Sequence, residues 1–320
     1  MAADEPDSTL AQSGEFAVID RLVSGRRQPS WVSVGPGDDA AVVAAPDGRT
    51  VLCTDMLVQD RHFRLDWSSP YDVGRKAIAQ NAADIEAMGA RATAYVVGFA
   101  APADTVTARA VELADGMWRE AELTGAAVVG GDMVQAPLWV ISVAAIGDLE
   151  GRDPVRRSGA APGDTVALCG ELGRSAAGYA LWDNKVDSFP GILRRHLVPE
   201  PPYGQGRVAA QWGATSMIDV SDGLLADLAH VTAASDVHIE LAIDALTDDI
   251  DAVTGAARAV GVDPRQWVLG GGEDHALVAT FAAELPPRWR RIGTVLPRDG
   301  AARLTVDGAQ WGGAPGWQSY

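Results

Sequence analysis

Lysine is almost absent from this chain: only Lys76 and Lys185 occur among 320 residues, and arginine supplies the remaining positive charge. The sequence therefore has no G-x-x-x-x-G-K-[ST] motif, the loop in which a lysine holds nucleotide phosphates. This absence excludes a P-loop nucleotide site. If the protein handles phosphates, metal ions and arginine side chains must neutralise their charge.

Cysteines and long apolar runs are also scarce. Cys53 and Cys169 are the only cysteines, and because they lack metal-ligand spacing we expect reduced thiols in a cytoplasmic protein. The formal net charge of −17 argues against nucleic acid as a partner. We expect neither a signal segment nor a membrane partner, because no apolar run approaches the ~20 residues that a bilayer span requires.

Length and apolar content predict a globular protein, with enough residues for one large domain or two ordinary ones. The apolar share of 47% supports a sizeable core. Strands and helices alternate through the first half, and the stretch 151–163 is rich in glycine, proline and arginine. We therefore expect an N-terminal domain at 1–150 and a C-terminal domain at 151–320.

The expected elements follow from apolar periodicity and turn residues. In the first half we expect helices at 15–22, 70–88 and 105–123, and strands at 50–55, 92–101, 126–129 and 138–146. In the second half we expect strands at 164–169, 216–220 and 276–281, and helices at 175–182 and 224–234. Ser69-Pro70-Tyr71-Asp72 is a typical helix start, since serine caps and proline suits the first position.

Acidic turns recur close to the expected strands. Gly35-Pro36-Gly37-Asp38-Asp39 precedes an apolar run, and Thr54-Asp55, Gly130-Gly131-Asp132 and Asp219 are each expected at the end of one. Gly271-Gly272-Glu273-Asp274 is a further acidic turn. Neighbouring carboxylates repel one another, and Mg²⁺ is the cation that oxygen ligands suit. A purely structural role, as turns that bond their own backbone, remains the alternative for each stretch alone.

Further polar residues are candidates of the same kind. Asp84 lies with Asn81 on the otherwise apolar face of helix 70–88, where it either caps a neighbouring loop or binds a metal. Ser221-Asp222-Gly223 begins a helix, which places backbone N–H groups beside carboxylates and suits a Mg²⁺-bound polyphosphate. Arg157 is either solvated charge or a phosphate clamp, and Trp317 either packs or stacks on a ring.

The ordered set of motifs resembles thiamine-monophosphate kinase, an enzyme family that phosphorylates thiamine phosphate to thiamine diphosphate. The matching segments are G-P-G-D-D-A-A at 35–41, T-D at 54–55, H-F at 62–63, N-A-A-D-I-E-A-M-G-A at 81–90, G-G-D at 130–132, R-S-G-A at 157–160, P-G-D at 162–164, D-V-S-D-G-L at 219–224 and G-G-E-D at 271–274. They span nearly the whole chain. The related superfamily includes aminoimidazole ribonucleotide synthetase and a hydrogenase-maturation enzyme, which use ATP without a P-loop.

The resemblance implies a two-domain α/β (α+β) fold of the synthetase-like ATP-binding type, without a P-loop. Its N-terminal mixed-sheet domain would form a homodimer, and its C-terminal α/β domain would cover ATP and substrate. Because two phosphate-bearing molecules must be brought together with almost no lysine, we expect several Mg²⁺ ions, and our hypothesis is direct in-line phosphoryl transfer without a catalytic side chain. The implied metal ligands are Asp39, Thr54, Asp55, Asp84, Asp132, Asp219 and Asp222, with Asp38 as a supporting carboxylate. The implied ATP contacts are Gly131, Asp132, Arg157 and Ser221, and the implied substrate contacts are His62, Glu273 and Trp317.

The sequence departs from the family pattern at two positions. Cys53 stands where a serine commonly precedes T-D, so a metal ligand is lost if that hydroxyl is used. His275 stands where tyrosine is usual, which we expect to affect local packing. Two other functions remain open: an ATP-dependent enzyme of the same superfamily with another acceptor, such as the hydrogenase-maturation type, and an acidic divalent-cation-binding protein without turnover.

Overall fold

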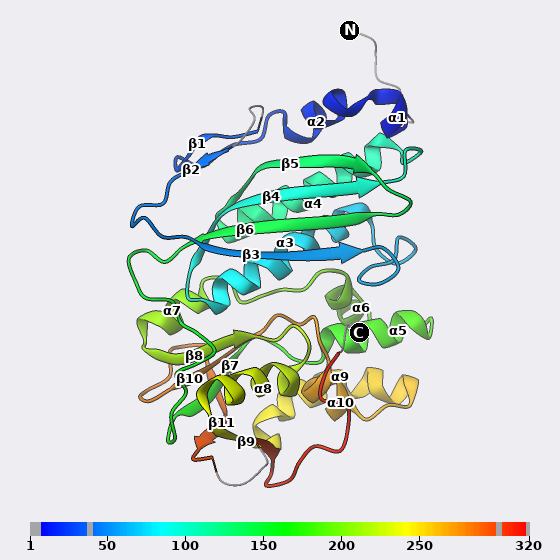
Figure 1. The fold of residues 1–320 in the computed structure, drawn as a ribbon. Coiled ribbons are helices and arrows are strands. Elements are labelled where there is room, and N and C mark those ends of the chain that lie inside the picture. Colours follow the sequence, from blue (N-terminus) through cyan, green and yellow to red (C-terminus); the bar gives the residue numbers. More distant parts are fainter. Residues whose placement is uncertain (1–7, 37–40, 299–302, 318–320) are drawn as a thin grey trace. The chain divides into compact units, whose positions relative to one another are not determined.

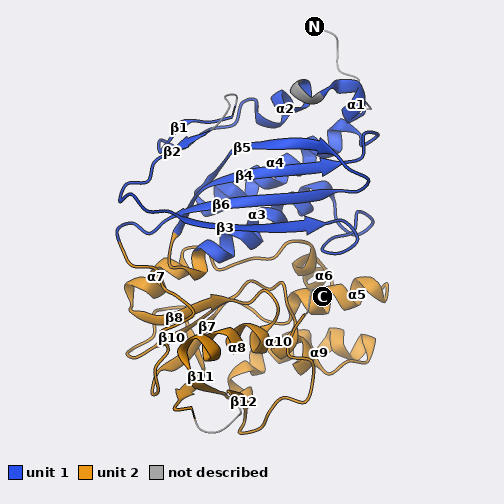
Figure 2. Cartoon of the chain, in the orientation of Figure 1, with its two compact units in different colours: residues 1–85, 91–151 blue, residues 86–90, 152–320 orange. Residues whose placement is uncertain are grey.

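The computed structural model describes residues 8–36, 41–298 and 303–317 and divides into two compact units (Figure 2). Unit 1 contains residues 1–85 and 91–151, and unit 2 contains 86–90 and 152–320. The short segment 86–90, at the end of a helix of unit 1, therefore packs with the second unit. No helix of the described residues has both the length and the apolar character that crossing a bilayer demands.

Unit 1 is built on a four-stranded mixed sheet with the order β3-β6-β4-β5. Helices α3 and α4 cover one face of this sheet (Figure 1). β6 pairs antiparallel with β3 and β4, whereas β4 and β5 are parallel. The elements are α1 (Leu10–Ser13), α2 (Glu15–Val23), β1 (Val32–Val34), β2 (Val42–Val43), β3 (Val51–Val58), α3 (Pro70–Ala87), β4 (Arg91–Ala101), α4 (Thr107–Thr124), β5 (Ala127–Gln135) and β6 (Val140–Asp148).

Unit 2 contains a six-stranded sheet with the order β12-β9-β11-β7-β10-β8. Its elements are β7 (Thr165–Cys169), α5 (Arg174–Asp183), α6 (Pro190–Leu197), α7 (Gln205–Gln211), β8 (Ala214–Asp219), α8 (Leu224–Ser235), β9 (His238–Leu241), η1 (Ile243–Leu246), α9 (Thr247–Val260), α10 (Pro264–Gly270), β10 (Leu277–Phe281), β11 (Arg290–Leu296) and β12 (Leu304–Val306). The helices and strands together confirm the predicted α/β class.

The central strands of this second sheet are buried on both faces, as β7 shows. Val166 and Leu168 enter a large apolar core with helices α5, α8, α9 and α10. Ala167 and Cys169 enter a second, smaller core with α7. Successive strand residues point to opposite faces, so a strand that is covered on both sides is apolar throughout.

Two predicted strand ends are wrong. β3 continues past Thr54-Asp55 to Val58, and β5 continues past Gly131-Asp132 to Gln135. The reason is pairing: β3 is hydrogen-bonded to β6 along its whole length, and β5 follows β4 up to the pair Ala101 and Gln135. Both pairs of candidate residues therefore lie inside strands, where neighbouring side chains face opposite sides of the sheet.

The start of α3 is confirmed in detail. The Asp72 N–H donates to Ser69 Oγ at 3.1 Å, and Ser69 Oγ donates to the Asp72 carboxylate at 2.7 Å. Pro70 occupies the first helical position. The helix ends at Ala87, before Gly89, whose φ of +70° suits glycine. Capping residues thus fixed the register that places Asn81 and Asp84 on the inner face.

Glu86 joins the end of α3 to the start of α7 inside unit 2. Its two carboxylate oxygens accept the N–H groups of Gly204 and Gly206, at 2.7 and 2.8 Å. Burial raises the pKa of this carboxyl to about 7, although the two N–H groups oppose the shift. The folded protein therefore keeps a proton on Glu86 that the unfolded chain releases above its ordinary pKa of 4.5.

This raised pKa predicts a pH-dependent stability. The contribution of protonated Glu86 is complete below about pH 4.5 and is lost as the pH rises through about 7. Between pH 5 and 8, the free energy of unfolding of the wild-type protein should fall by about 2 kcal/mol relative to that of Glu86→Gln. Urea titrations at both pH values measure this difference. The control variant Glu284→Gln, at an exposed position, should show the same change in the free energy of unfolding between pH 5 and 8 as the wild type. An equal change in the wild type and in Glu86→Gln would refute the prediction.

Candidate functional site

Two carboxylates of unit 1 meet beside α3. Asp55 lies on β3 and faces inward, and its N–H donates to Asn81 Oδ1 at 3.0 Å. Asn81 is fully buried and donates through Nδ2 to the Ala77 carbonyl at 2.9 Å. Asp84, one helical turn further along α3, is half-buried. Asn81 therefore fixes the backbone of β3 against the helix that carries Asp84.

Cys53 is close enough to both carboxylates for their charges to act on its thiol. Burial, then the charge of Asp84 and a hydrogen bond to it, and then the charge of Asp55 raise the pKa of the Cys53 thiol far above its ordinary value. The thiol therefore stays protonated and also donates to the Asn81 carbonyl at 3.5 Å. The negative field that raises this pKa is the field that a divalent cation would experience here.

Thr54 and Asp132 lie on the other face of the sheet. Thr54 is exposed on β3, between the inward-facing Cys53 and Asp55. Asp132 is exposed on β5 and is paired with Gly98 of β4. Gly98 is paired in turn with Ser142 of β6, and Ser142 with the exposed Met56 of β3, so Asp132 and Met56 face the same side of the sheet. Within unit 1 the structure thus brings Asp55 and Asp84 together, and it separates their side chains from those of Thr54 and Asp132.

An apolar cavity of about 960 Å³ lies beside Gly130, Gly131 and Asp132. Its walls include Val96, Phe99 and Trp118. Gly131 is required by the strand pairing, because a Cβ there would lie 2.1 Å from the Val97 carbonyl oxygen. Asp38 and Asp39 lie outside the described residues.

His62 lies in the turn after β3, held from two sides. Its Nδ1 accepts the Val58 N–H at 3.0 Å, so the neutral ring carries its proton on Nε2. The buried Lys76 ammonium donates to the His62 carbonyl at 2.9 Å. His62 is half-buried, and these two contacts fix the position of its ring.

The β8–α8 turn of unit 2 gathers several carboxylates. Asp219 is buried at the end of β8 and accepts the Ser221 hydroxyl at 2.9 Å. Asp227, in the first turn of α8, accepts the N–H groups of Asp222 and Gly223 through one oxygen, both at 3.0 Å. Burial, followed by the charge of Asp219, raises the pKa of Asp227 to about 7. The turn therefore has a negative electrostatic field, and the Asp227 carboxyl fixes its backbone by two hydrogen bonds.

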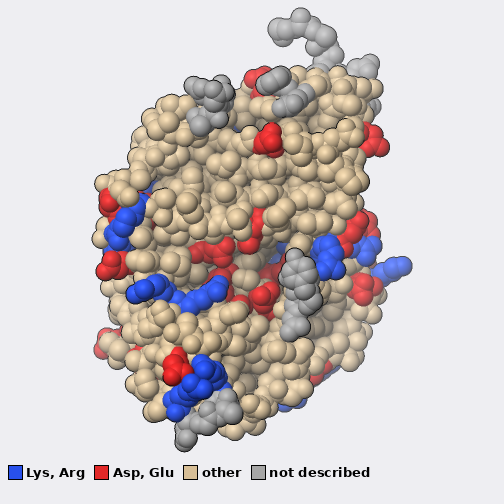
Figure 3. All heavy atoms as spheres, viewed as in Figure 1, with Lys and Arg blue, Asp and Glu red and all other residues tan. Residues whose placement is uncertain are grey.

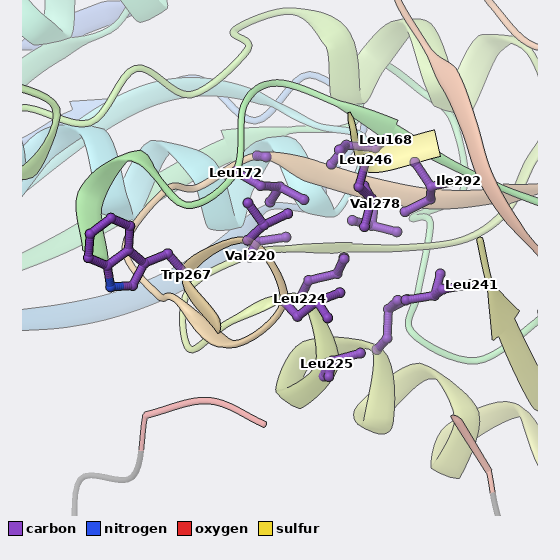
Figure 4. Packing of buried hydrophobic residues seen from close by; sticks show 14 of the residues in the cluster. Leu168, Leu172, Val220, Leu224, Leu225, Leu241, Leu246, Trp267, Val278 and Ile292 are labelled. Atoms are coloured by element: carbon purple, nitrogen blue, oxygen red, sulfur yellow. The ribbon is translucent and has the colours of Figure 1, made fainter. Parts of the chain in front are cut away.

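The apolar core anchors this turn on both sides. Val220 and Leu224, which flank Ser221-Asp222-Gly223, are fully buried in the core that also contains Leu172 and Trp267 (Figure 4). Gly223 has a φ of +134°, and a Cβ there would lie 2.8 Å from the backbone of Gly270. Only glycine fits this position, because the two loops pass in direct contact.

Two further loops are hydrogen-bonded to the same turn. The Glu273 N–H donates to the Ser221 carbonyl at 2.7 Å, and the Trp317 N–H donates to the Asp222 carbonyl at 2.9 Å. His275 Nδ1 lies 3.1 Å from an Asp219 oxygen. The structure thus brings together five of the candidates, which are Asp219, Ser221, Asp222, Glu273 and Trp317.

Asp227 and His275 were missed as members of this site. Asp227 had a sequence signal, because an acid in the first turn of a helix that follows S-D-G can accept free N–H groups. His275 was expected to affect packing alone, whereas it contacts a candidate metal ligand. Arg157 is exposed in the loop before β7, and its carbonyl accepts the Ser235 hydroxyl at 3.2 Å.

The donor atoms in both units suit a magnesium ion. In the described part of the chain, no group of three His, Cys, Asp or Glu side chains is arranged to hold a metal by itself. Mg²⁺ rarely uses such a cage: it keeps water ligands and is bound by one or two carboxylates together with substrate phosphates. The oxygen donors and the negative field at Cys53 and at Asp227 fit this mode of binding.

Comparisons with known proteins agree on one family. A family model described as AIR synthase related protein, N-terminal domain, matches residues 37–149. The chain is 65% identical over 320 residues to a thiamine-monophosphate kinase of Mycobacterium tuberculosis, covering 100% of this chain and 95% of that relative. The solved structure of AaThiL complexed with AMPPCP and TMP matches with a TM-score of 0.77 at 28% identity over 100% of both chains. The hydrogenase maturation protein HypE shares the fold at 18% identity, with a TM-score of 0.70 over 90% of this chain and 94% of that one.

Proposed function

The chain belongs to the thiamine-monophosphate kinase family, and on this premise we propose that it phosphorylates thiamine phosphate to thiamine diphosphate with ATP. The observation that carries the proposal is the β8–α8 turn. There backbone hydrogen bonds tie Ser221 and Asp222 to Glu273 and Trp317, and Asp219 accepts the Ser221 hydroxyl. Oxygen ligands for a metal-bound phosphate and groups suited to an organic ring therefore occur at one place in unit 2.

In this proposal the candidate carboxylates of both units bind Mg²⁺. Asp55 and Asp84 do so beside α3, and Asp219 and Asp222 do so at the β8–α8 turn. Asp39 is a further ligand, as are Thr54 and Asp132, whose side chains lie on the opposite face of the unit 1 sheet from Asp55. When bound, the metal ions neutralise the phosphate oxygens of ATP and of the acceptor, which otherwise repel each other by about 4 kcal/mol for two unit charges ~4 Å apart. Magnesium is thus the cofactor, and ATP the co-substrate.

The side chains position the two substrates and do not form a covalent intermediate. Gly131 and Asp132, beside the apolar cavity, and Arg157 and Ser221 are the proposed ATP contacts. His62 donates its Nε2–H to the acceptor phosphate, whose ionised oxygen needs no general base. That oxygen attacks the γ-phosphorus in line, the bond to the β-phosphate oxygen breaks, and ADP leaves.

We also propose that the outer sheet face of unit 1 pairs with a second copy of the chain. Leu52, Met56, Val96 and Val134 are exposed hydrophobic residues on this sheet. Figure 3 shows few charged side chains over the unit 1 surface that faces the viewer. A large apolar face of this kind is typical of homodimer interfaces. Sedimentation of the purified protein at the mass of one chain would contradict this homodimer.

We place the reaction in the cytoplasm, where ATP is available and thiols stay reduced.

A substrate panel separates this function from its alternatives. With ATP and Mg²⁺, the purified protein should release ADP with thiamine phosphate and not with thiamine or with carbamoyl phosphate. ADP release with another acceptor alone would favour a different enzyme of the superfamily. HypE, one such enzyme, is similar to this chain in fold only. Binding of Mg²⁺ without binding or turnover of ATP would favour a cation-binding protein.

A further inference from the structure

Three side chains from separate elements of unit 2 form a cluster: His196, Tyr179 and the candidate substrate residue Glu273. His196, near the end of α6, has its Nδ1 3.5 Å from a Glu273 carboxylate oxygen and 3.2 Å from Ser175 Oγ. The ring of Tyr179, on α5, packs edge-on against the His196 ring, with centroids 5.5 Å apart. Helices α5 and α6 lie side by side (Figure 1). The imidazole of His196 thus contacts the Glu273 carboxylate and packs against the ring of Tyr179.

The exposure of these residues differs in a way that suits ligand binding. His196 is buried, with 7% of its surface exposed, whereas Tyr179 is 51% exposed. The Glu273 side chain is 32% exposed, so its carboxylate reaches solvent on one side and His196 on the other. Through their common neighbour His196, a half-exposed tyrosine and a partly exposed carboxylate supply an apolar face and a negative charge in one region of unit 2.

The backbone around Glu273 is held in a costly conformation. Glu273 and His275 both have positive φ, 62° and 53°, which residues other than glycine adopt rarely. The conformation persists because the Glu273 N–H is fixed to Ser221 and the His275 N–H to Val220, at 2.7 and 2.9 Å. Asp274 between them accepts the N–H groups of Gly173 and Ser175 at the start of α5. Such strain is typical of functional positions, and here it fixes Glu273 relative to α5.

We propose that Tyr179 and His196 complete the acceptor site and select a flat organic cation. The Tyr179 ring contacts the ring of the acceptor, Glu273 pairs with its positive charge, and His196 is a positioning residue that holds the Glu273 carboxylate. This inference rests on the proposed function, whose acceptor carries a positively charged ring. ATP is repelled by the same carboxylate, so the cluster distinguishes the acceptor from the nucleotide.

Kinetics of Tyr179 variants test the proposal. Tyr179→Ala should raise the KM for thiamine phosphate about tenfold, as expected for a lost cation–ring contact, with kcat and the KM for ATP within about twofold. Tyr179→Phe keeps the ring and should restore the wild-type KM. Trp212→Ala removes another half-exposed aromatic residue of unit 2 and is the matched control, with all constants unchanged. An unchanged KM for thiamine phosphate in Tyr179→Ala would overturn the proposal.

Variants of His196 test the positioning role. His196→Ala should raise the KM for thiamine phosphate, and His196→Gln, which keeps a polar group near Glu273, should recover part of the loss. Because His196 is buried, the rates of its variants are measured well below the melting temperature of each. Ser175→Ala serves as a further variant, which removes only the 3.2 Å contact between Ser175 Oγ and His196 Nδ1. Equal acceptor KM values in all three variants and the wild type would refute this role.

A binding titration keeps this proposal separate from the proposed function. Thiamine phosphate is titrated calorimetrically into the full chain without ATP. Binding that weakens in Tyr179→Ala and Glu273→Gln supports the cluster even if no turnover is found, in which case only the kinase function fails. Normal turnover with unchanged acceptor binding in both variants rejects the cluster and leaves the kinase function intact. Absence of binding to the wild type rejects both.

Discussion

Asp222→Asn should lower kcat at least about a hundredfold, because it removes a negative oxygen ligand from the place where the phosphate charge must be neutralised. The fold should survive. The backbone N–H of Asp222 still donates to Asp227, and its carbonyl still accepts the Trp317 N–H. The charge of Asp222 also contributes to the raised pKa of Asp227, so its removal relieves repulsion within the turn. We therefore expect the melting temperature to stay equal or rise while activity collapses.

The matched control for this experiment is Asp251→Asn, which removes an exposed carboxylate from α9 in the same unit. It changes the net charge equally and should leave kcat unchanged. Initial rates are measured at saturating ATP, thiamine phosphate and Mg²⁺, and a magnesium titration shows whether more metal restores the variant. A rate for Asp222→Asn within threefold of the wild-type rate would show that the carboxylate has a purely structural role.

Gly116→Ala should destabilise unit 1 by about 3 kcal/mol or more. α3 and α4 cross at Gly74 and Gly116, and their backbones touch there. A Cβ on Gly116 would lie 2.0 Å from the Tyr71 carbonyl oxygen, and one on Gly74 equally close to the Leu113 carbonyl oxygen. Neither contact can be relieved by rotating a side chain, so one helix must move away from the other. Since α3 carries Asn81 and Asp84, activity should fall with stability.

Gly191→Ala is the control for the glycine experiment. Gly191 is exposed in the first turn of α6, and a Cβ there meets no atom within 4 Å. The substitution should leave the free energy of unfolding unchanged or raise it by up to about 1 kcal/mol, since alanine favours helix. Urea denaturation compares the two variants with the wild type. Equal midpoints for Gly116→Ala and Gly191→Ala would contradict the packing described for α3 and α4.

The sequence predicted those features that are local. The cap at Ser69, the alternation of strands and helices up to residue 150, and the inner position of Asn81 depend on neighbouring residues only, and the structure confirms them. The association of Asp219 with Ser221 was predictable for the same reason, as they are two residues apart. The family resemblance came from such local motifs taken in order.

Features that depend on pairing between distant segments could not be predicted. The lengths of β3 and β5 follow from their neighbours β6 and β4, and this pairing places Asp132 inside a strand on the face opposite Asp55. Tyr179, His196 and Glu273 are brought together by helix packing across almost a hundred residues of sequence, without any motif. No element was expected at α9 or β11, although α9 buries Val253, Ala256 and Ala257, a spacing typical of an amphipathic helix.

The central claim is that this chain transfers the γ-phosphoryl group of ATP directly to thiamine phosphate. It is tested in a single turnover with γ-labelled ATP, Mg²⁺ and excess enzyme, with product and protein separated at each time point. We predict that the label leaves ATP and appears in thiamine diphosphate at the same rate, with none on the protein. Labelled protein that forms and decays at the rate of turnover, or label that never reaches thiamine diphosphate, would contradict the account.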